Sequence, residues 1–245
     1  MQNNYIPRTE YDFWLDGVSG SSLGLAVEIP PVPPMALQQY TVYRFGGDAL
    51  GYAPDNEFDA ITITINARVI RNPENYDNSA LYAFLQGKSL LKISRLPGHH
   101  FRVRRVLGVT PKQKAYGNDI TYSMQFVCDP WKYLDDNPEA VLPQDGVIVN
   151  PGTRYSKPIV RLTKSGSDEA TITTNGVQFK IAGSQTGLIT IDSDRMLVYK
   201  TVSNVNTAIT QYTTGNLPML SPGQNIMQVS SNITGVTIVG NWRCY

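Results

Sequence analysis

The sequence predicts a mainly β protein with one short helix. Apolar and polar residues alternate over several short segments, and dipeptides that favour tight turns separate these segments. Gly, Pro, Thr, Ser, Asn and Tyr are plentiful, whereas charged residues make up only 17% of the chain, a composition typical of β architectures with many loops. At 245 residues the chain suits two domains of ordinary size or one large β domain.

The beginning of the chain is expected to hold extended segments joined by long loops. A strand over residues 23–29 leads into the proline-rich stretch 30–34, which cannot belong to a central strand because proline lacks the N–H donor. A short strand over 40–45 precedes a long loop over 46–56. Apolar and polar residues then alternate over 61–69, which predicts a strand with one buried face.

One helix is expected before the next strands. Asp77 or Asn78 can cap its beginning, and Gly87 stands where a left-handed cap would end it. Its apolar stripe has the spacing i, i+3, i+4: Leu81, Phe84 and Leu85. The helix is too short to be stable alone, so we expect it to pack on a sheet.

Further strands are predicted over residues 90–94, 101–109 and 120–128, with a β-bulge at Arg105-Val106 where the alternation slips. Cys128 falls on the apolar face of the last of these strands and is expected to be a buried thiol. A disulfide between Cys128 and Cys244 stays open. The N-terminus has no signal-peptide pattern, so we expect folding in a reducing cytoplasm, which argues against that bond.

From Asp129 to Pro158 prolines and acidic residues replace the alternation, which predicts a domain boundary. We place the two domains at 1–142 and 143–245.

Beyond this boundary two hairpins are predicted. Asn175-Gly176 favours a type I′ turn, because both central positions need φ > 0. Its ladder pairs Thr174 with Val177, Ile172 with Phe179 and Ala170 with Ile181. A second hairpin over 188–199 would turn at Ser193-Asp194, placing Ile191 opposite Met196 and Ile189 opposite Val198. Strands at 159–163 and 236–239 complete a pattern typical of a sandwich.

No catalytic or cofactor pattern emerges, and we expect a protein that is not an enzyme and binds no metal. The two histidines, His99 and His100, are adjacent, are assigned to a loop, and lack cysteine or carboxylate partners at ligand spacing. Acidic residues follow Trp131 and Tyr133, an arrangement that could form a sugar cleft but fits a solvated linker turn better: Asp135, Asp136 and Glu139.

Charge gives no global attraction to nucleic acid or membrane. Lys and Arg exceed Asp and Glu by one, and no apolar run reaches the roughly 20 residues of a spanning helix. The local basic cluster Arg102, Arg104 and Arg105 lacks the interleaved aromatics of a nucleic-acid groove. We interpret it as a solvated face or a subunit contact.

A set of motifs, in order over the whole chain, resembles siphophage distal tail proteins. The opening segment 14–25 has the family's aromatic-x-Asp-Gly-x-Ser pattern before a small-residue turn. The loop 45–50 is similar to the family's glycine-aspartate loop, although the usual arginine between Gly and Asp is absent. Further matching segments are 126–133, 150–153 with 158–160, 188–193, 217–225 and Trp242-Arg243.

The resemblance implies a fold and a structural role. The N-terminal domain would be a tail-tube-like β-sandwich or barrel with one helix, and the C-terminal domain a galectin-like sandwich. Six copies would close into a ring that joins the tail tube protein to the baseplate hub, with DNA passing through the bore without sequence-specific binding. Receptor-binding proteins would dock outside. The protein would be part of the virion tail tip, assembled in the host cytoplasm, without membrane insertion.

The predicted subunit interface consists of two segments: Trp14, Asp16 and Gly17, and the loop Gly46, Gly47 and Asp48. Ordinary core burial of Trp14 and a simple tight turn at Asp16-Gly17 stay open as alternatives. Long Gly/Pro loops suit arms that reach a neighbour, and a closing rotation of one heterologous interface gives a ring. The alternative function is a carbohydrate-binding module, because galectin-like sandwiches can hold sugars in aromatic-lined grooves.

Overall fold

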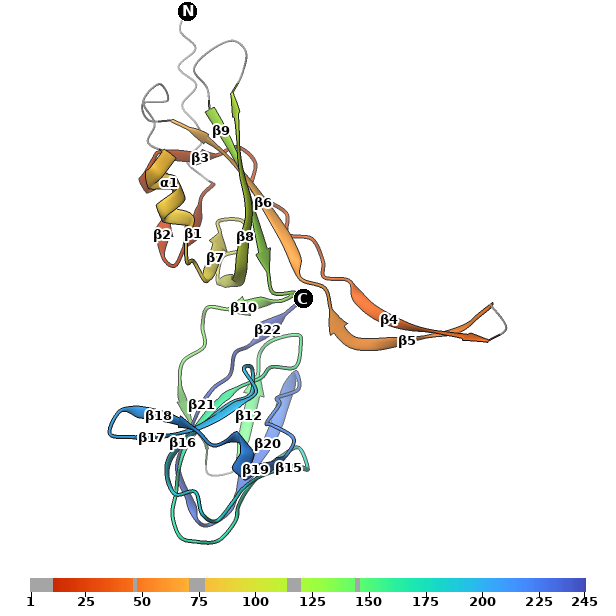
Figure 1. Cartoon of the computed structure of the whole chain (residues 1–245), viewed down its shortest axis with the longest axis vertical. Helices are drawn as coiled ribbons and strands as arrows, with labels where there is room; N and C mark the ends of the chain where they lie inside the picture. Colours follow the sequence, from red (N-terminus) through yellow and green to blue (C-terminus); the bar gives the residue numbers. More distant parts are fainter. Residues whose placement is uncertain (1–10, 46–47, 71–77, 114–119, 144–145) are drawn as a thin grey trace, which may run out of the picture. The chain divides into compact units, whose positions relative to one another are not determined.

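The computed structural model describes residues 11–45, 48–70, 78–113, 120–143 and 146–245, with the backbone alone for 40–45, 48–57 and 113. The chain divides into two compact units (Figure 1): Met1–Tyr133 with Tyr245 form unit 1, and Leu134–Cys244 form unit 2. In the described part of the chain, no helix combines the length and the apolar character needed to cross a membrane.

Unit 1 is built on an antiparallel sheet with the strand order β2-β1-β7-β8-β9-β6-β3, and β10 pairs beside β8. A 3-10 turn, η1 (Gly20–Leu23), precedes β3, and the helix α1 (Asn78–Leu85) precedes β7. The strands are β1 (Phe13–Leu15), β2 (Val18–Ser19), β3 (Leu25–Val27), β6 (Ile61–Val69), β7 (Leu90–Ile93), β8 (His99–Gln113), β9 (Ile120–Cys128) and β10 (Lys132–Leu134).

The core of unit 1 draws on strands from both sides of this sheet's order. Apolar residues from β3, at one end of the order, and from β1, next to the other end, share one buried cluster with α1 and with the central strands. Along β6 every second residue is buried, from Ile61 to Val69, as the alternation predicts. The helix is confirmed: Leu81, Phe84 and Leu85 are its buried residues, and Gly87 has φ +65°.

Cys128 lies in this core on the same face as Tyr122, Met124 and Phe126, as predicted. Burial raises the pKa of the Cys128 thiol to about 12, and the neighbouring charge of Asp129 adds to the shift. Cys128 and Cys244 are both free and buried.

Strand β8 carries two irregularities rather than one. Its register against β9 shifts between Val103 and Arg105 and again between Val106 and Gly108, on either side of the predicted bulge. His99 and His100 open this strand, so their assignment to a loop is wrong. The pairing of β7 with β8 at Leu91 and Phe101 extends the ladder to this end of β8.

The predicted loop over 46–56 is also wrong for its described part. β4 (Gln38–Phe45) and β5 (Asp48–Phe58) form a hairpin, the orange ribbon of Figure 1, with Val42 opposite Tyr52 and Tyr40 opposite Pro54. The pair forms a two-stranded sheet of its own among the described strands. Both strands are therefore edges, where Gly and Pro are tolerated because no second neighbour needs the N–H groups.

Unit 2 is a sandwich of two antiparallel sheets with the orders β11-β21-β13-β16-β17-β18 and β12-β20-β14-β15-β19. Apolar residues from both sheets form one buried cluster, which is the core of the sandwich. The strands are β11 (Ala140–Val141), β12 (Val147–Asn150), β13 (Ile159–Lys164), β14 (Ala170–Thr174), β15 (Val177–Ile181), β16 (Gly187–Asp192), β17 (Leu197–Val202), β18 (Val205–Ala208), β19 (Thr213–Gly215), β20 (Gly223–Val229), β21 (Ile233–Val239) and, outside these two orders, β22 (Arg243–Cys244).

The first predicted hairpin is confirmed in turn and register. Asn175 and Gly176 have φ of 49° and 83°, and all three predicted pairs occur between β14 and β15. The register predicted for the second hairpin is wrong: Ile191 lies opposite Val198 rather than Met196. Asp192 accepts hydrogen bonds from the N–H groups of Asp194 and Arg195, which lengthens the turn. The shift is two residues, so every side chain keeps its face and the apolar pattern could not detect it.

The division between the units falls at Tyr133 and Leu134, upstream of the boundary placed after residue 142. Within the intervening stretch, Ala140 and Val141 pair with Ile238 and Thr237 of β21. This pairing places β11 in the sandwich of unit 2.

Candidate assembly surface

The first predicted interface segment forms the turn between β1 and β2. Asp16 and Gly17 have φ of 47° and 84°, the left-handed values that a type I′ turn requires. Trp14 pairs with Ser19 and Leu15 with Val18 across this turn. Asp16-Gly17 is therefore a tight turn, and its tip is exposed.

The Asp16 carboxylate accepts hydrogen bonds from other residues of unit 1. Its Oδ1 accepts hydrogen bonds from Leu90 N at 2.8 Å, Ser89 Oγ at 3.0 Å and Ser89 N at 3.2 Å. Desolvation raises the pKa of Asp16, but the hydrogen bonds from Leu90 and Ser89, with the charge of Lys88, outweigh it and leave the pKa below its ordinary value. This carboxylate fastens the β1–β2 turn to the start of β7.

The small residues after this turn also have local structural reasons. Ser19 caps η1 by accepting from Ser21 N at 3.1 Å, and its hydroxyl donates to Asp12 Oδ2. A Cβ on Gly20 would lie 2.3 Å from a ring atom of Phe13, which is fully buried. The Ser-Gly part of the motif is thus a packing and capping requirement of unit 1.

Trp14 differs from its neighbours in β1. Phe13 and Leu15 are fully buried in the core, whereas Trp14 is half-buried and points to the opposite face because side chains alternate along a strand. Its ladder partners there are Ser19 and Lys92. Complete core burial, the alternative for Trp14, does not occur. The other predicted interface residues are Gly46, Gly47 and Asp48. Gly46 and Gly47 lie outside the described residues, and so does the side chain of Asp48.

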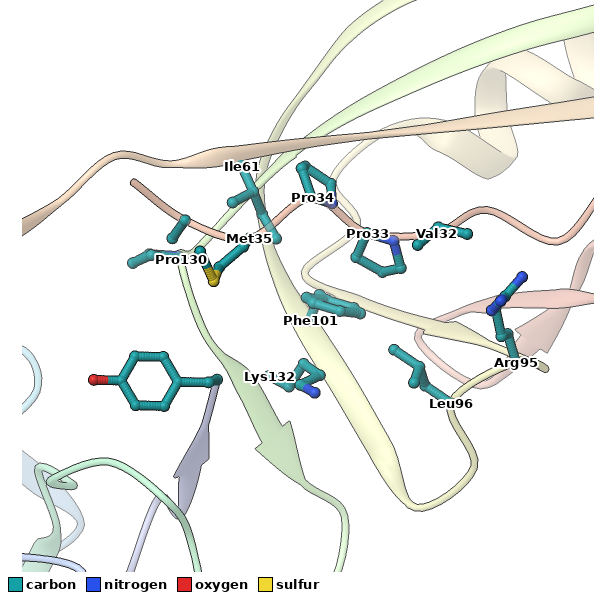
Figure 2. Close-up of a pocket in the computed structure, with 12 residues that line it drawn as sticks. Val32, Pro33, Pro34, Met35, Ile61, Arg95, Leu96, Phe101, Pro130 and Lys132 are labelled. Carbon is teal, nitrogen blue, oxygen red and sulfur yellow. The ribbon is translucent and has the colours of Figure 1, made fainter. Parts of the chain in front are cut away.

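A second candidate surface is a groove of about 330 Å³ in unit 1. One wall is the proline strap, which we define as residues 29–37 between β3 and β4. The floor is buried: Ile61 is 5% exposed and Phe101 is 2% exposed. Figure 2 shows Phe101 between Pro33 of the strap and Lys132, with Met35 and Pro130 toward one end and Arg95 and Leu96 toward the other.

The strap presents apolar side chains outward. Met35 is 77% exposed and Val32 70% exposed, although both line the groove. Hydrogen bonds fasten the strap only at its ends in the part of the chain that is described: Glu28 N donates to Asn66 O, and Asp59 N donates to Leu37 O at 3.0 Å. The sequence interpretation noted the prolines but did not predict this surface. The sequence signal that could have indicated it is the apolar residues that stand beside these prolines.

Basic residues near the groove fall into two groups. Arg104 forms an ion pair with the buried Asp129, which also accepts from Tyr133 Oη at 2.9 Å, and the Arg102 guanidinium lies 4.0 Å from the centre of the Tyr133 ring. Both arginines therefore have structural contacts inside unit 1. Arg95 and Lys132 line the groove, and neither has a carboxylate partner among the described residues.

The aromatics proposed for a sugar cleft do not form an open platform. Trp131 is 6% exposed and packs edge-on against Phe58 at 4.5 Å, while Tyr133 is 2% exposed. Glu139 forms an ion pair with Arg161 at 2.6 Å and accepts from Thr237, and these hydrogen bonds lower its pKa. Buried aromatics cannot stack on a sugar ring, so the sugar-cleft alternative at this position is wrong.

Histidine and carboxylate clusters do not suggest metal chemistry. His100 stacks on Tyr133 with 5.6 Å between ring centres, and His99 Nδ1 lies 3.0 Å from Pro97 O. No group of three or more His, Cys, Asp or Glu side chains arranged for a metal ion occurs within the described ranges.

The structural comparison gives whole-chain matches. The chain is similar to the SPP1 Dit (gp 19.1) protein, a hub adsorption apparatus protein of phages that infect Gram-positive bacteria, with a TM-score of 0.68 and 16% identity, covering 94% of this chain and 97% of that one. It is also similar to chains of the phage p2 baseplate in its activated conformation with Sr (TM-score 0.55, 9% identity) and with Ca (0.53, 10%), each covering 93% of this chain and 96% of the other.

No protein-family model matches the chain, and no curated protein does. The fold expected from the resemblance is nevertheless confirmed: the chain is mainly β and has the fold of the SPP1 Dit protein along nearly its whole length. The resemblance rests on short motifs, and several of their residues are turn, cap and packing positions that this fold requires.

Proposed function

We propose that the protein is a non-enzymatic structural component of a bacteriophage tail tip. Six copies assemble into a ring that joins the tail tube to the baseplate hub, DNA passes through the bore without sequence-specific recognition, and receptor-binding proteins dock outside. The observation that carries the proposal is the likeness to SPP1 Dit over 94% of this chain and 97% of that protein. Both units of the chain are included in that likeness.

Features of unit 1 support assembly through its surface. Trp14 keeps part of its ring outside the core, the β4–β5 hairpin forms a separate two-stranded sheet, and the proline strap exposes apolar side chains. Large exposed apolar patches on soluble proteins commonly mark interaction sites. A closed ring formed by one repeated heterologous contact would cover such surfaces on every subunit.

The test is the assembly state of the full chain at high concentration. Native mass spectrometry and negative-stain imaging should show six copies around a hole. Trp14→Ala should weaken the ring because it removes a half-buried aromatic from the predicted interface, whereas Tyr212→Ala, which removes a 46% exposed aromatic from unit 2, should leave it intact.

Monomers alone in concentrated solution and in tail preparations would contradict the proposal. Retention of the monomer on a glycan array would instead favour the carbohydrate-binding function. Circular dichroism of both variants separates loss of assembly from loss of folding.

A further inference from the structure

The groove beside the proline strap has the composition of a peptide-binding surface. Its floor of Ile61 and Phe101 is fixed in the core, and its wall carries Val32 and Met35, which are exposed. Inserting an apolar side chain would remove water from both surfaces, which favours binding in proportion to the apolar area buried. A volume of about 330 Å³ suits one or two side chains and not a folded domain.

The backbone of the strap favours an extended ligand. In the described structure the segment between Glu28 and Leu37 forms no backbone ladder with another strand. Four prolines restrict its φ values, so the strap loses little conformational entropy when a partner binds. An extended peptide could therefore lie along it without first rearranging the wall.

The charges identify the chemistry of the ligand. Arg95 and Lys132 both line the groove and lack carboxylate partners within the described ranges. No acidic side chain of the described residues lines the groove with them. The surrounding stretch 78–118 reinforces this sign, since it contains no Asp or Glu and eight basic residues: Lys88, Lys92, Arg95, Arg102, Arg104, Arg105, Lys112 and Lys114.

We propose that this groove binds an extended segment of a partner protein in which an apolar side chain is flanked by Asp or Glu. The apolar side chain occupies the space between the strap and Phe101, and the carboxylates pair with Arg95 and Lys132. A protein segment is favoured over nucleic acid because most of the lining is aliphatic and proline-rich. Tyr245 is the one exposed aromatic among the described lining residues, whereas a nucleic-acid groove stacks successive bases on several aromatics. The setting as a tail-tip contact rests on the proposed function, but binding by the groove does not require the ring.

A selection experiment on the full chain tests this. A display library of random short peptides is selected on the immobilised wild-type protein and counter-selected on the double variant Arg95→Glu/Lys132→Glu. We expect enriched peptides that combine Leu, Ile, Phe or Met with Asp or Glu. Fluorescence anisotropy of a synthetic enriched peptide should show at least about tenfold weaker binding to the double variant, because two attractive ion pairs are replaced by repulsion.

A charge swap and a matched control sharpen the result. Replacing Asp and Glu of the peptide by Lys should restore binding to the double variant. The control Arg105→Glu/Lys112→Glu changes the net charge equally at exposed positions that do not line the groove, and should alter the affinity less than about twofold. Thermal unfolding of all three proteins verifies that they fold.

The proposal fails if no peptide is enriched, if enriched peptides lack acidic residues, or if both double variants weaken binding equally. Selective binding of a duplex or single-stranded oligonucleotide that is lost in Arg95→Glu/Lys132→Glu also overturns it. If Met35→Asp converts an oligomer into a monomer, a second copy occupies the groove and the peptide proposal is wrong. The ring proposal would then stand, because imaging of the wild type tests it separately.

Discussion

Two stretches of about equal length differ in the charge of their side chains. Residues 78–118 of unit 1 contain basic side chains and no acidic ones, whereas residues 201–242 of unit 2 contain no Asp, Glu, Lys or Arg at all. In the first stretch arginines need partners from elsewhere, such as Asp129 for Arg104. In the second, hydrogen bonds of a buried amide hold the segments together: Asn225 is fully buried and bonds with Ser221, Gly223 and Asn175. The difference teaches that arginines of unit 1 depend on ion pairs and ring contacts inside the unit, whereas this part of unit 2 is held by neutral hydrogen bonds that salt does not screen.

The largest effect is expected at Asn225. Asn225→Ala leaves Ser221 N, Ser221 O and the Asn175 amide without their buried partner, so unit 2 should lose about 3 kcal/mol of unfolding free energy. Chemical denaturation with hydrogen-exchange mass spectrometry locates the loss. Asn206→Ala, at an exposed position, should cost less than about 0.5 kcal/mol. Equal losses in the two variants would contradict the role given to buried amides.

Asp129 provides the counterpart in unit 1. Asp129→Asn weakens the ion pair with Arg104 and the hydrogen bond from Tyr133, and should destabilise unit 1 by about 2 kcal/mol. Faster amide exchange should concentrate in β8 and β9. Asp59→Asn, which alters an exposed carboxylate that accepts from Gln39, is the matched control. An unchanged β8–β9 exchange rate in Asp129→Asn would show that the arginines need no such partner.

Asp16 should make the β1–β2 turn weakly sensitive to acid. Its pKa is lower in the folded state than in the unfolded state, so its contribution is complete above about pH 4 and is lost as the pH falls through the folded value. Wild-type protein should therefore lose more stability than Asp16→Asn when the pH decreases from about 5 to 2. The effect is small because this carboxylate is largely exposed. Parallel acid titrations of the two proteins would argue against the assignment.

The smallest expected effect is that of salt. Raising NaCl from about 0.05 to 0.5 M screens repulsion among the basic residues of 78–118 and should slow amide exchange there slightly. Peptides from 201–242 should exchange at unchanged rates, since they carry no charged side chain. A uniform response of both stretches would remove the contrast between them.

The sequence was most informative where local chemistry alone determines the structure. The Asn175-Gly176 turn, the burial pattern of β6 and the stripe of α1 each follow from a short segment, and each is confirmed. Prediction failed where two solutions have the same pattern. The β16–β17 register is an example, because a shift of two residues keeps Ile189 and Ile191 on the same face.

The candidate surfaces were harder to predict because they depend on residues far apart in the chain. Asp16 and Gly17 could be located as a turn, yet the bonds from Ser89 and Leu90 to Asp16 require tertiary structure. The strap groove combines Met35, Phe101 and Lys132 from separate segments. Composition misled at residues 48–56, where Gly and Pro suggested a loop but the backbone forms an edge strand.

The distribution of the cysteines has a practical consequence. Cys128 belongs to unit 1 and Cys244 to unit 2, and both thiols are buried. Cys128 lies in the core of unit 1, whereas Cys244 lies outside the core cluster of unit 2. The rate at which Cys128 becomes modified by an alkylating reagent would therefore measure the opening of unit 1, without introducing a label or a mutation.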